Sequence, residues 1–494
     1  MGKMLKLADI QGNIVQAYRF PLARYIMFQV TEEGKAREFI KKIIPHITTG
    51  EMWEKGGKPE VTTNIAFSYQ GLKAIGLNES SLRQFPLAFA EGMKARAHLL
   101  GDEGDSGPHQ WDECWQEHVD ILLTINARTV SDLNSLTEIT ESEKAHLNDF
   151  HEALKSLCDS TGGIKVLGQQ DANVLFYNGK PCAKEHFGFD DGIGNPSFSG
   201  TDLATMKIPG KGKQLADGSW VPLAAGEFIL GHADESQAIP EAPRPRLLTD
   251  NGTYMVYRKL HQNVASFRKY LVDTGKEYAK TLDMSKYRHA DGTAAKGWEI
   301  LAAKMAGRWL DGTPVELSPY GQDPSIRADS ARNNDFNYTG DKDAATCPFG
   351  AHVRRTNPRG SLGFDGKLTS RRRILRRGLP YGTPTPFDKL GRDQDEHGII
   401  FMAINASIER QFEFVQQLWI NYGNDFYQSN DKDILTGAND GTDQAVIQND
   451  PEGEKPPFIC RNIPRFVTVR GGEYFFIPSM TALKLLSEKA VSTI

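Results

Sequence analysis

Two patterns of apolar residues, one typical of strands and one of helices, alternate along the first half of the chain. Runs rich in β-branched and aromatic residues, which are typical of strands, occupy 23–30, 64–72, 118–127 and 173–178. Apolar residues at intervals of three and four predict a helix over 31–47, with Thr31 as its candidate N-cap, and a second over 128–157. The first half is therefore predicted to combine strands with amphipathic helices.

The second half repeats this pattern. Strands are predicted over 226–232, 252–260 and 398–407, and helices over 264–275 and 408–422. Two comparable sets of strands and helices predict an α+β protein with a duplicated unit. The boundary is expected in the Gly/Lys-rich stretch 208–220, which would link an N-terminal domain, 1–207, to a C-terminal domain, 221–494.

Composition argues against nucleic-acid-binding, membrane-spanning and disulfide-rich classes of protein. The chain has 494 residues, 39% of them hydrophobic, and a net charge of −5, which gives no reason to expect nucleic acid as a partner. No run approaches the roughly 20 apolar residues of a membrane span, and the charged N-terminal stretch does not resemble a signal peptide. The five cysteines are scattered without a CxxC spacing, so neither a disulfide framework nor a thiolate metal site is indicated. A cytoplasmic protein that binds no membrane is the prediction.

The loop "HFGFDDGIGNP", 186–196, places two acids side by side between glycines. Neighbours on an extended backbone point to opposite faces, so Asp190 and Asp191 are not expected to share one site. Too few oxygens follow them for a calcium loop. The alternative that stays open is that one aspartate caps a turn and the glycines serve only backbone geometry.

Two further segments combine polar and cationic residues. In "CPFGAHVRRTNPR", 347–359, His352 is followed by three arginines, a cluster that suits an anionic cofactor beside a metal ligand. A lone histidine is otherwise most often a structural residue. In "SRRRILRRGLPYG", 370–382, Ile374 and Leu375 interrupt five arginines. Alternation there would turn one guanidinium inward, where it requires an anion.

Taken together, these segments resemble the dye-decolorizing peroxidase family. "GFDDG" fits the family's G-x-x-D-G signature, "GAHVRRTNPR" its proximal-histidine segment and "RRILRRGLPYG" its distal-arginine segment. "LADIQGNI" near the N-terminus and "GIIFMAINASIERQFEFVQQLW" downstream also resemble stretches of the larger, C/D-type members. The resemblance spans the whole chain in family order. It implies a pair of ferredoxin-like domains with facing antiparallel sheets, the dimeric α+β barrel arrangement.

The resemblance also implies roles for single residues. Asp191 would be the distal acid/base, Arg376 the distal arginine and His352 the iron ligand, whereas Asp190 falls on a variable position. The expected haem contacts are Ile193 and Gly194 at its edge, Ile399 and Phe401 on its distal face, Arg354 at a propionate, and Asp433 as acceptor of the second N–H of the histidine. Ile399 and Phe401 are two residues apart in a predicted strand, so they would face the same side.

The function implied is that of a peroxidase with one haem b per chain. Such an enzyme reduces hydrogen peroxide to water and oxidises dyes, phenolics or other one-electron donors through a high-valent iron–oxo intermediate. An alternative is a haem-handling protein that binds porphyrin or releases iron without much turnover, and another is a haem-free protein with the same fold. Retention of both Asp191 and Arg376 argues against a carrier, which needs neither.

Overall fold

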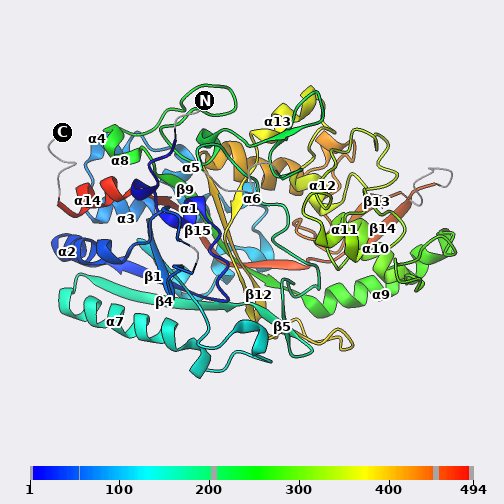
Figure 1. Ribbon diagram of the computed structural model, residues 1–494, viewed down its shortest axis with the longest axis horizontal. Helices are drawn as coiled ribbons and strands as arrows, with labels where there is room; N and C mark the ends of the chain where they lie inside the picture. The colour runs from blue at the N-terminus through cyan, green and yellow to red at the C-terminus, as the bar shows by residue number, and fades with distance from the viewer. Residues whose placement is uncertain (1–3, 55, 202–207, 449–455, 489–494) are drawn as a thin grey trace.

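An antiparallel β-sheet runs through the whole molecule. The structure is a computed structural model that describes residues 4–54, 56–201, 208–448 and 456–488. The sheet contains β1 (Leu22–Val30), β2 (Val61–Phe67), β3 (Ile121–Ala127), β4 (Ile164–Asn173), β9 (Thr253–Gln262), β10 (Leu375–Arg376), β11 (Pro380–Gly382), β12 (His397–Asn405) and β15 (Val467–Ile477). Its strand order is β10-β12-β9-β15-β2-β3-β1-β4, and β11 also pairs with β12. The four strands from the first half of the chain are therefore adjacent, and so are those from the second half (Figure 1).

Each half of the sheet has the same connectivity. In the first half, α2 (Glu33–Ile43) joins β1 to β2, and α7 (Ala145–Thr161) joins β3 to β4. In the second, α9 (Val264–Thr281) follows β9, and the helical turns η11 (Ile408–Glu413) and η12 (Val415–Ile420) join β12 to β15. When β11, which lies off this path, is left out, the strands of each half number one to four and their order is 4-1-3-2 in both. The predicted pair of ferredoxin-like units is confirmed.

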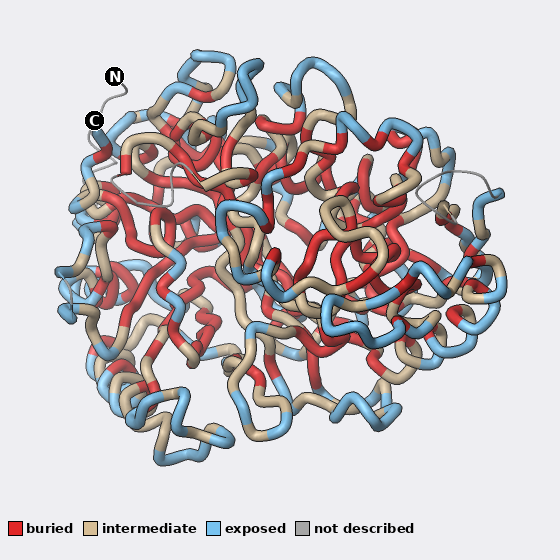
Figure 2. The backbone as a smooth tube through the Cα atoms, turned by 45° about the vertical axis from the view of Figure 1, so that its right-hand side comes forward, coloured by how far each residue is buried: buried red, intermediate tan, exposed pale blue. Residues whose placement is uncertain are grey.

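The two units meet at both edges of their sheets. The edge strands β15 and β2 pair through Phe476 and Phe67, and at the other end of the strand order β11 lies beside β4. The sheet thus curls back on itself and leaves few unpaired edges exposed. Helices α2 and α7 cover the outside of the first unit (Figure 1), and buried backbone fills the middle of both units (Figure 2).

The other elements are shorter. The helices are α1 (Gly12–Val15), α3 (Tyr69–Ala74), α4 (Glu79–Leu82), α5 (Leu87–Ala95), α6 (Ala97–Leu100), α8 (Arg246–Thr249), α10 (Gly297–Ala306), α11 (Pro324–Ala328), α12 (His352–Thr356), α13 (Lys367–Ser370) and α14 (Met480–Glu488). Three two-stranded sheets pair β5 (Leu175–Tyr177) with β6 (Lys180–Cys182), β7 (Lys213–Gln214) with β8 (Trp220–Val221), and β13 (Asp443–Ile447) with β14 (Phe458–Ile463).

Several predicted elements appear with shifted ends. The strands expected over 23–30, 118–127, 252–260 and 398–407 are β1, β3, β9 and β12, and both helices expected in the second half are present. The strand expected over 64–72 ends at Phe67, because the Ser68 hydroxyl accepts the Gly71 N–H and starts α3. The strand expected over 173–178 is reduced to β5.

Other predictions were wrong. The run 226–232 is not a strand: it begins within the 3-10 turn η9 (Ala225–Glu227) and continues as turns, and its apolar residues are buried in the core. The helix expected from residue 128 begins only at Ala145. Thr31 caps nothing, since the N-cap of α2 is Glu32. Strand β4 was missed because its sequence is polar and most of its residues are only partly buried.

The predicted linker 208–220 is largely folded. It carries β7 and leads into β8, and the Trp220 indole N–H donates to the Asp335 carboxylate at 2.8 Å. Residues 202–207, next to the expected boundary, lie outside the described residues, so the domain limits stay predictions. No helix in the described part of the chain is long and apolar enough to cross a membrane, and the cytoplasmic location also stays a prediction.

Candidate active site

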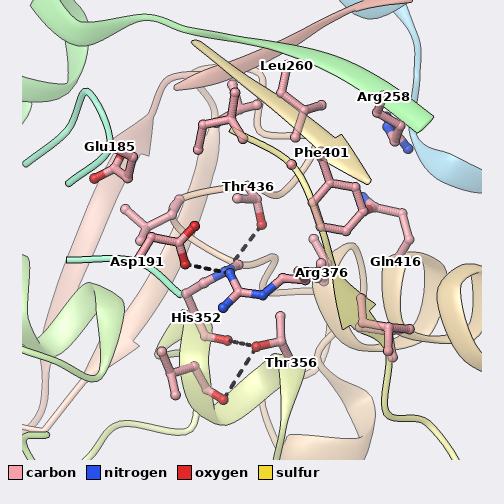
Figure 3. Close-up of a pocket in the computed structure, with 18 of the residues that line it drawn as sticks. Glu185, Asp191, Arg258, Leu260, His352, Thr356, Arg376, Phe401, Gln416 and Thr436 are labelled. Carbon is pink, nitrogen blue, oxygen red and sulfur yellow. Dashed lines mark hydrogen bonds and ion pairs between the residues drawn. The ribbon is translucent and has the colours of Figure 1, made fainter. Parts of the chain in front are cut away.

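A cavity of about 370 Å³ lies against the second half of the sheet. Its walls come from β9, β12, β15, α12 and η12, from the loop around Asp191, and from the segments 100–106 and 435–438. Its volume is that of a small-molecule site, and apolar side chains make up much of its lining. Figure 3 shows Asp191, Arg376 and His352 directed toward the same space from different segments. The cavity thus unites the three residues to which the sequence assigned chemistry.

His352 opens the short helix α12. Its Nδ1 lies 3.0 Å from Oδ2 of Asp433, whose side chain is fully buried, and 3.3 Å from the Thr436 hydroxyl. Burial alone would lower the pKa of His352, but the charge and hydrogen bond of Asp433 outweigh it and raise that pKa. A proton held on Nδ1 by this carboxylate leaves the lone pair of Nε2 available as a metal ligand.

Asp191 and Arg376 form an ion pair inside the same cavity. Arg376 Nη1 donates to Asp191 Oδ1 at 2.6 Å, and the Gly192 N–H donates to the same oxygen. Burial would raise the pKa of Asp191, but the Arg376 charge and these hydrogen bonds lower it below its usual value. The side chain remains 45% exposed, which keeps the carboxylate accessible from the cavity. The group is therefore an ionised, reachable base.

The loop that carries Asp191 is fixed to the strand that carries Arg376. The backbone N–H of Arg376 donates to Asn195 Oδ1 at 2.9 Å, and Asn195 Nδ2 donates to the Arg376 carbonyl at 3.3 Å. Gly188 and Gly192 have φ values of 108° and 77°, which an L side chain rarely adopts. The glycines bend the loop, and Asn195 aligns it with β10.

Asp190 has different partners. Its carboxylate pairs with Arg327 at 2.9 Å and with Lys184 at 3.2 Å. The adjacent acids therefore serve separate ion pairs, as the alternation of the backbone predicts. Ile193, Gly194, Ile399 and Phe401 all line the cavity, and the last two project from the same face of β12.

The expectation for Arg354 is wrong. Its side chain is fully buried and does not line the cavity. Its guanidinium donates to the Asp341 carboxylate at 2.7 Å and to the Cys347 carbonyl at 2.6 Å. Positions two residues apart on a helix point about 200° away from each other, so Arg354 and His352 cannot both face the cavity from α12.

Several other arginines line the cavity, and three of them, Arg359, Arg373 and Arg308, are buried and make no ion pair with a described residue. Arg359 donates to the backbone carbonyls of Asn334 and Phe336. Arg373 donates to the backbone carbonyl of Gly194, and Arg308 to those of Gly312 and Asn333. Burial lowers the pKa of Arg373 to about 9 and that of Arg308 to about 10. Buried cations without a counter-charge indicate an anionic ligand. Arg359 and Arg373 stand in the motifs noted above, but no sequence signal singled out Arg308.

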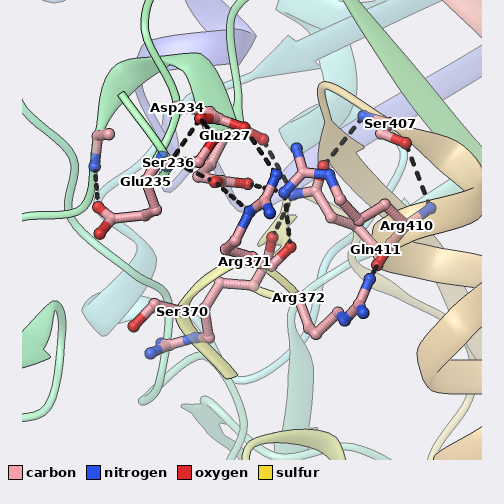
Figure 4. Close-up of polar contacts among 12 residues, drawn as sticks. Glu227, Asp234, Glu235, Ser236, Ser370, Arg371, Arg372, Ser407, Arg410 and Gln411 are labelled. Atoms are coloured by element: carbon pink, nitrogen blue, oxygen red, sulfur yellow. Dashed lines mark hydrogen bonds and ion pairs between the residues drawn. The ribbon is translucent and has the colours of Figure 1, made fainter. Parts of the chain in front are cut away.

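The arginine-rich segment before β10 is itself held by a buried polar network (Figure 4). Gln411 Nε2 donates to the Arg373 carbonyl at 2.6 Å and to the Glu227 carbonyl at 2.9 Å. Arg410 donates to the Arg371 carbonyl at 3.1 Å and pairs with the Glu227 carboxylate at 2.5 Å. These contacts fix the backbone just before Arg376.

Comparisons with known proteins agree with this geometry. The chain matches the DyP dimeric alpha+beta barrel domain over residues 9–162 and the C-terminal domain of Dyp-type peroxidases over 231–432. It belongs to the dye-decolorizing-type peroxidase family. The dye-decolorizing peroxidase msp1 of Mycetinis scorodonius is 29% identical over 97% of this chain and 87% of that protein. The multifunctional dye peroxidase DyP2 of an Amycolatopsis strain is 26% identical over 97% of this chain and 96% of its own.

Solved structures of the dye-decolorizing-type peroxidase family have the same fold. A dye-decolorizing peroxidase in complex with 2,6-dimethoxyphenol superposes with a TM-score of 0.78 at 26% identity, over 99% of this chain and all of that one. An ancestral D-type enzyme gives 0.76 at 28% identity, over 97% of this chain and 99% of that one. The chain is thus a peroxidase of the dye-decolorizing type, and the family depends on haem.

The ion pair predicts the response of Asp191 to loss of its partner. In Arg376→Leu the compensating charge is gone, so the pKa of Asp191 should rise toward the ordinary value of about 4. An infrared pH titration of the carboxylate bands, with Asp191→Asn to identify the signal, measures this pKa. Arg376→Lys keeps a cation and should show a smaller rise. An unchanged pKa in Arg376→Leu would mean that the ion pair does not set it.

Proposed function

We propose that the cavity binds one haem b per chain and that the protein reduces hydrogen peroxide to water while it oxidises dyes, phenolics or other one-electron donors. The observation that carries the proposal is the meeting of two pairs in one cavity, His352 with Asp433 and Asp191 with Arg376. The first pair suits an iron ligand, and the second suits the cleavage of peroxide. A related enzyme whose structure contains 2,6-dimethoxyphenol supports phenols as donors.

The lining residues fit haem. His352 offers one imidazole nitrogen, which is what the iron of haem peroxidases takes from the protein. Arg359, Arg373 and Arg308 offer buried guanidinium groups, none of which has an acidic partner among the described residues, to a ligand with two carboxylates. Ile399, Phe401 and the adjoining aliphatic side chains provide an apolar wall for a flat macrocycle. Arg359 and Arg373 therefore take the role that the sequence assigned to Arg354.

Asp191 acts as both base and acid. Its ionised carboxylate accepts a proton from one oxygen of peroxide and returns it to the other, which leaves as water. Arg376 stabilises the negative charge that develops on the departing oxygen, an effect of about 3 kcal/mol for a single well-placed donor. Bound haem would hold the two oxidising equivalents that peroxide delivers until the donors reduce it, one electron at a time.

Asp433 is the positioning residue on the other side. Its carboxylate accepts the Nδ1–H of His352, which fixes the ring orientation and makes Nε2 a stronger electron donor. The N–H groups of Leu435 and Thr436 donate to its other oxygen at 2.9 and 2.8 Å. Burial would raise the pKa of Asp433, but the charge and hydrogen bond of His352, together with the backbone hydrogen bonds, lower it. The carboxylate is therefore ionised although it is fully buried.

Substitutions of Asp190 and Asp191 should have different effects on activity. Asp191→Asn removes the base and should slow the reaction with peroxide by about 10²-fold or more. Asp190→Asn breaks the ion pairs with Arg327 and Lys184 but leaves the base, so it should lower the melting temperature and retain most of the peroxide rate. Stopped-flow kinetics of the haem-loaded variants measure both. A haem-handling protein would load haem in both variants with no difference in peroxide rate.

The arginines offer a second test, this time of the cofactor site. Arg359→Leu should release haem to an excess of apomyoglobin about tenfold faster than the wild type, because one charge-assisted hydrogen bond to the ligand is lost. Arg354→Leu should instead destabilise folding by about 3 kcal/mol, because it leaves Asp341 buried and unpaired. Equal haem loss from both variants, at temperatures where both are folded, would contradict the assignment of the carboxylate site.

A further inference from the structure

Asn334 is a buried polar residue at the cavity wall that the mechanism above does not use. It is 1% exposed, lines the cavity and lies in the segment between α11 and α12. Its backbone carbonyl already accepts a hydrogen bond from Arg359. Its side-chain amide makes a second set of contacts, and these join two parts of the site that lie far apart in the sequence.

The oxygen of this amide faces the arginines of the cavity. Asn334 Oδ1 accepts from Arg308 Nη2 at 2.7 Å and from Arg359 Nη2 at 3.4 Å. Because guanidinium nitrogens only donate, these two contacts determine which end of the amide is the oxygen. The amide nitrogen is thereby directed to the other side of the residue.

The nitrogen of the amide faces the loop that carries Asp191. Asn334 Nδ2 donates to the Ile193 carbonyl at 3.3 Å and to Asn333 Oδ1 at 2.8 Å. Ile193 follows Asp191 by two residues, and the N–H of Gly192 between them donates to the Asp191 carboxylate at 2.6 Å. The hydrogen bond from Asn334 therefore acts on the stretch of backbone that orients Asp191.

Two further contacts join the same loop to arginines of the cavity. Arg373 donates to the Gly194 carbonyl at 3.1 Å. Arg308 donates to the Gly312 carbonyl at 2.8 Å, and Gly312 packs so closely on Ile193 that an added Cβ would lie 2.6 Å from Ile193 Cδ1. The groups that offer their charge to an anionic ligand thus also hold the loop of the peroxide base.

A bound anion would strengthen this connection. Buried guanidiniums whose partners are neutral carbonyl oxygens are incompletely compensated, and a carboxylate fixes their position through charge-assisted hydrogen bonds. Once Arg308 and Arg359 are fixed, the oxygen of Asn334 is fixed with them, and its N–H stays directed at Ile193. The cost of ordering these side chains then falls on ligand binding and not on the peroxide step.

We propose that Asn334 is a positioning residue that couples occupancy of the carboxylate site to the Asp191 loop. This role rests on the proposed function, because the anion that enters the site is a haem carboxylate. Asn334 moves no proton and binds no iron. It holds the Ile193 carbonyl so that the loop presents Asp191 beside Arg376, and it does so most firmly when the arginines have bound an anion.

The first test uses porphyrin without iron. Protoporphyrin IX has two carboxylates, whereas its dimethyl ester has the same ring without their charge. The backbone N–H groups of Asp190 and Asp191 are hydrogen-bonded, so hydrogen exchange of peptides from 186–197, followed by mass spectrometry, reports opening of the loop. In the wild type these amides should exchange about tenfold more slowly with the diacid than with the ester, which corresponds to about one charge-assisted hydrogen bond.

Substitution of Asn334 should remove most of this difference. In Asn334→Ala the ratio between ester and diacid should fall to about twofold, because only the contacts of Arg373 and Gly312 remain. Asn334→Asp keeps an acceptor for Arg308 and Arg359 but loses the N–H toward Ile193. It should therefore fold at least as well as the wild type and still lose the protection, at porphyrin concentrations that saturate each variant.

Asn337→Ala is the matched control. Asn337 lies in the same segment and has its own side-chain hydrogen bonds, which involve Gln214 and Thr339, but it is not among the residues that line the cavity. Its substitution should leave the tenfold ratio between ester and diacid at the wild-type value.

A kinetic test uses the haem-loaded protein. Asn334→Ala should lower the second-order rate constant for peroxide by about tenfold, because the base is held less well in place. The rate at which donors reduce the oxidised enzyme should stay at the wild-type value, since Asp191 has completed its task by then. Stopped-flow measurements give both rates. Equal slowing of the two steps would show that Asn334 acts only through packing, which would overturn the proposal.

The remaining outcomes separate the coupling from the proposed function. Equal protection by diacid and ester in the wild type would overturn the coupling, and so would a ratio that is unchanged in both Asn334 variants. In either case haem binding and a slow Asp191→Asn would still support the proposed function. A wild-type protein that bound neither porphyrin nor haem would overturn the proposed function and the coupling with it.

Discussion

Charge compensation inside a cavity of low polarity is the constraint on which this structure depends. The ionised Asp191 is stable there because Arg376 and the Gly192 N–H bind it, and Asp433 because His352 and two backbone N–H groups do. An uncompensated buried ion costs several kcal/mol, so each pair fixes the segments that carry it. The Asp191 loop, β10, α12 and the segment after η12 are held around one space by these pairs.

The same need for charge compensation applies to the part of the cavity that contains the unpaired arginines. Arg359, Arg373 and Arg308 are bound by carbonyl oxygens alone, so an anion that enters between them completes the balance of charge. Glu185 represents the opposite case, a buried carboxylate without a cation, and its pKa is raised by burial in spite of three hydrogen bonds.

Much of this site could be predicted from the sequence, because its main residues stand in continuous motifs. Asp191, His352 and Arg376 are marked by short local patterns, and Ile399 and Phe401 by the long apolar run of β12. The duplicated α+β fold also follows from the alternation of strands and helices. Arg354 illustrates the limit, since two residues of separation on α12 reverse its direction, and whether that segment is helical is not evident from "AHVRRTNPR".

Other features depend on contacts between distant segments and leave no local signal. Arg308 faces the cavity only because α10 ends beside it. Strand β4 escaped prediction for a different reason: it is polar and half-exposed, so the closure of the sheet, and not its own composition, makes it a strand.

The most direct measurement is a crystal structure of the protein loaded with haem. We predict that the iron is bonded to Nε2 of His352, that Asp433 accepts the Nδ1–H, and that Asp191 and Arg376 lie on the opposite face. The haem carboxylates should contact Arg359 and Arg373. Iron bonded to another side chain, or haem bound with Asp191 and His352 on the same side, would contradict it.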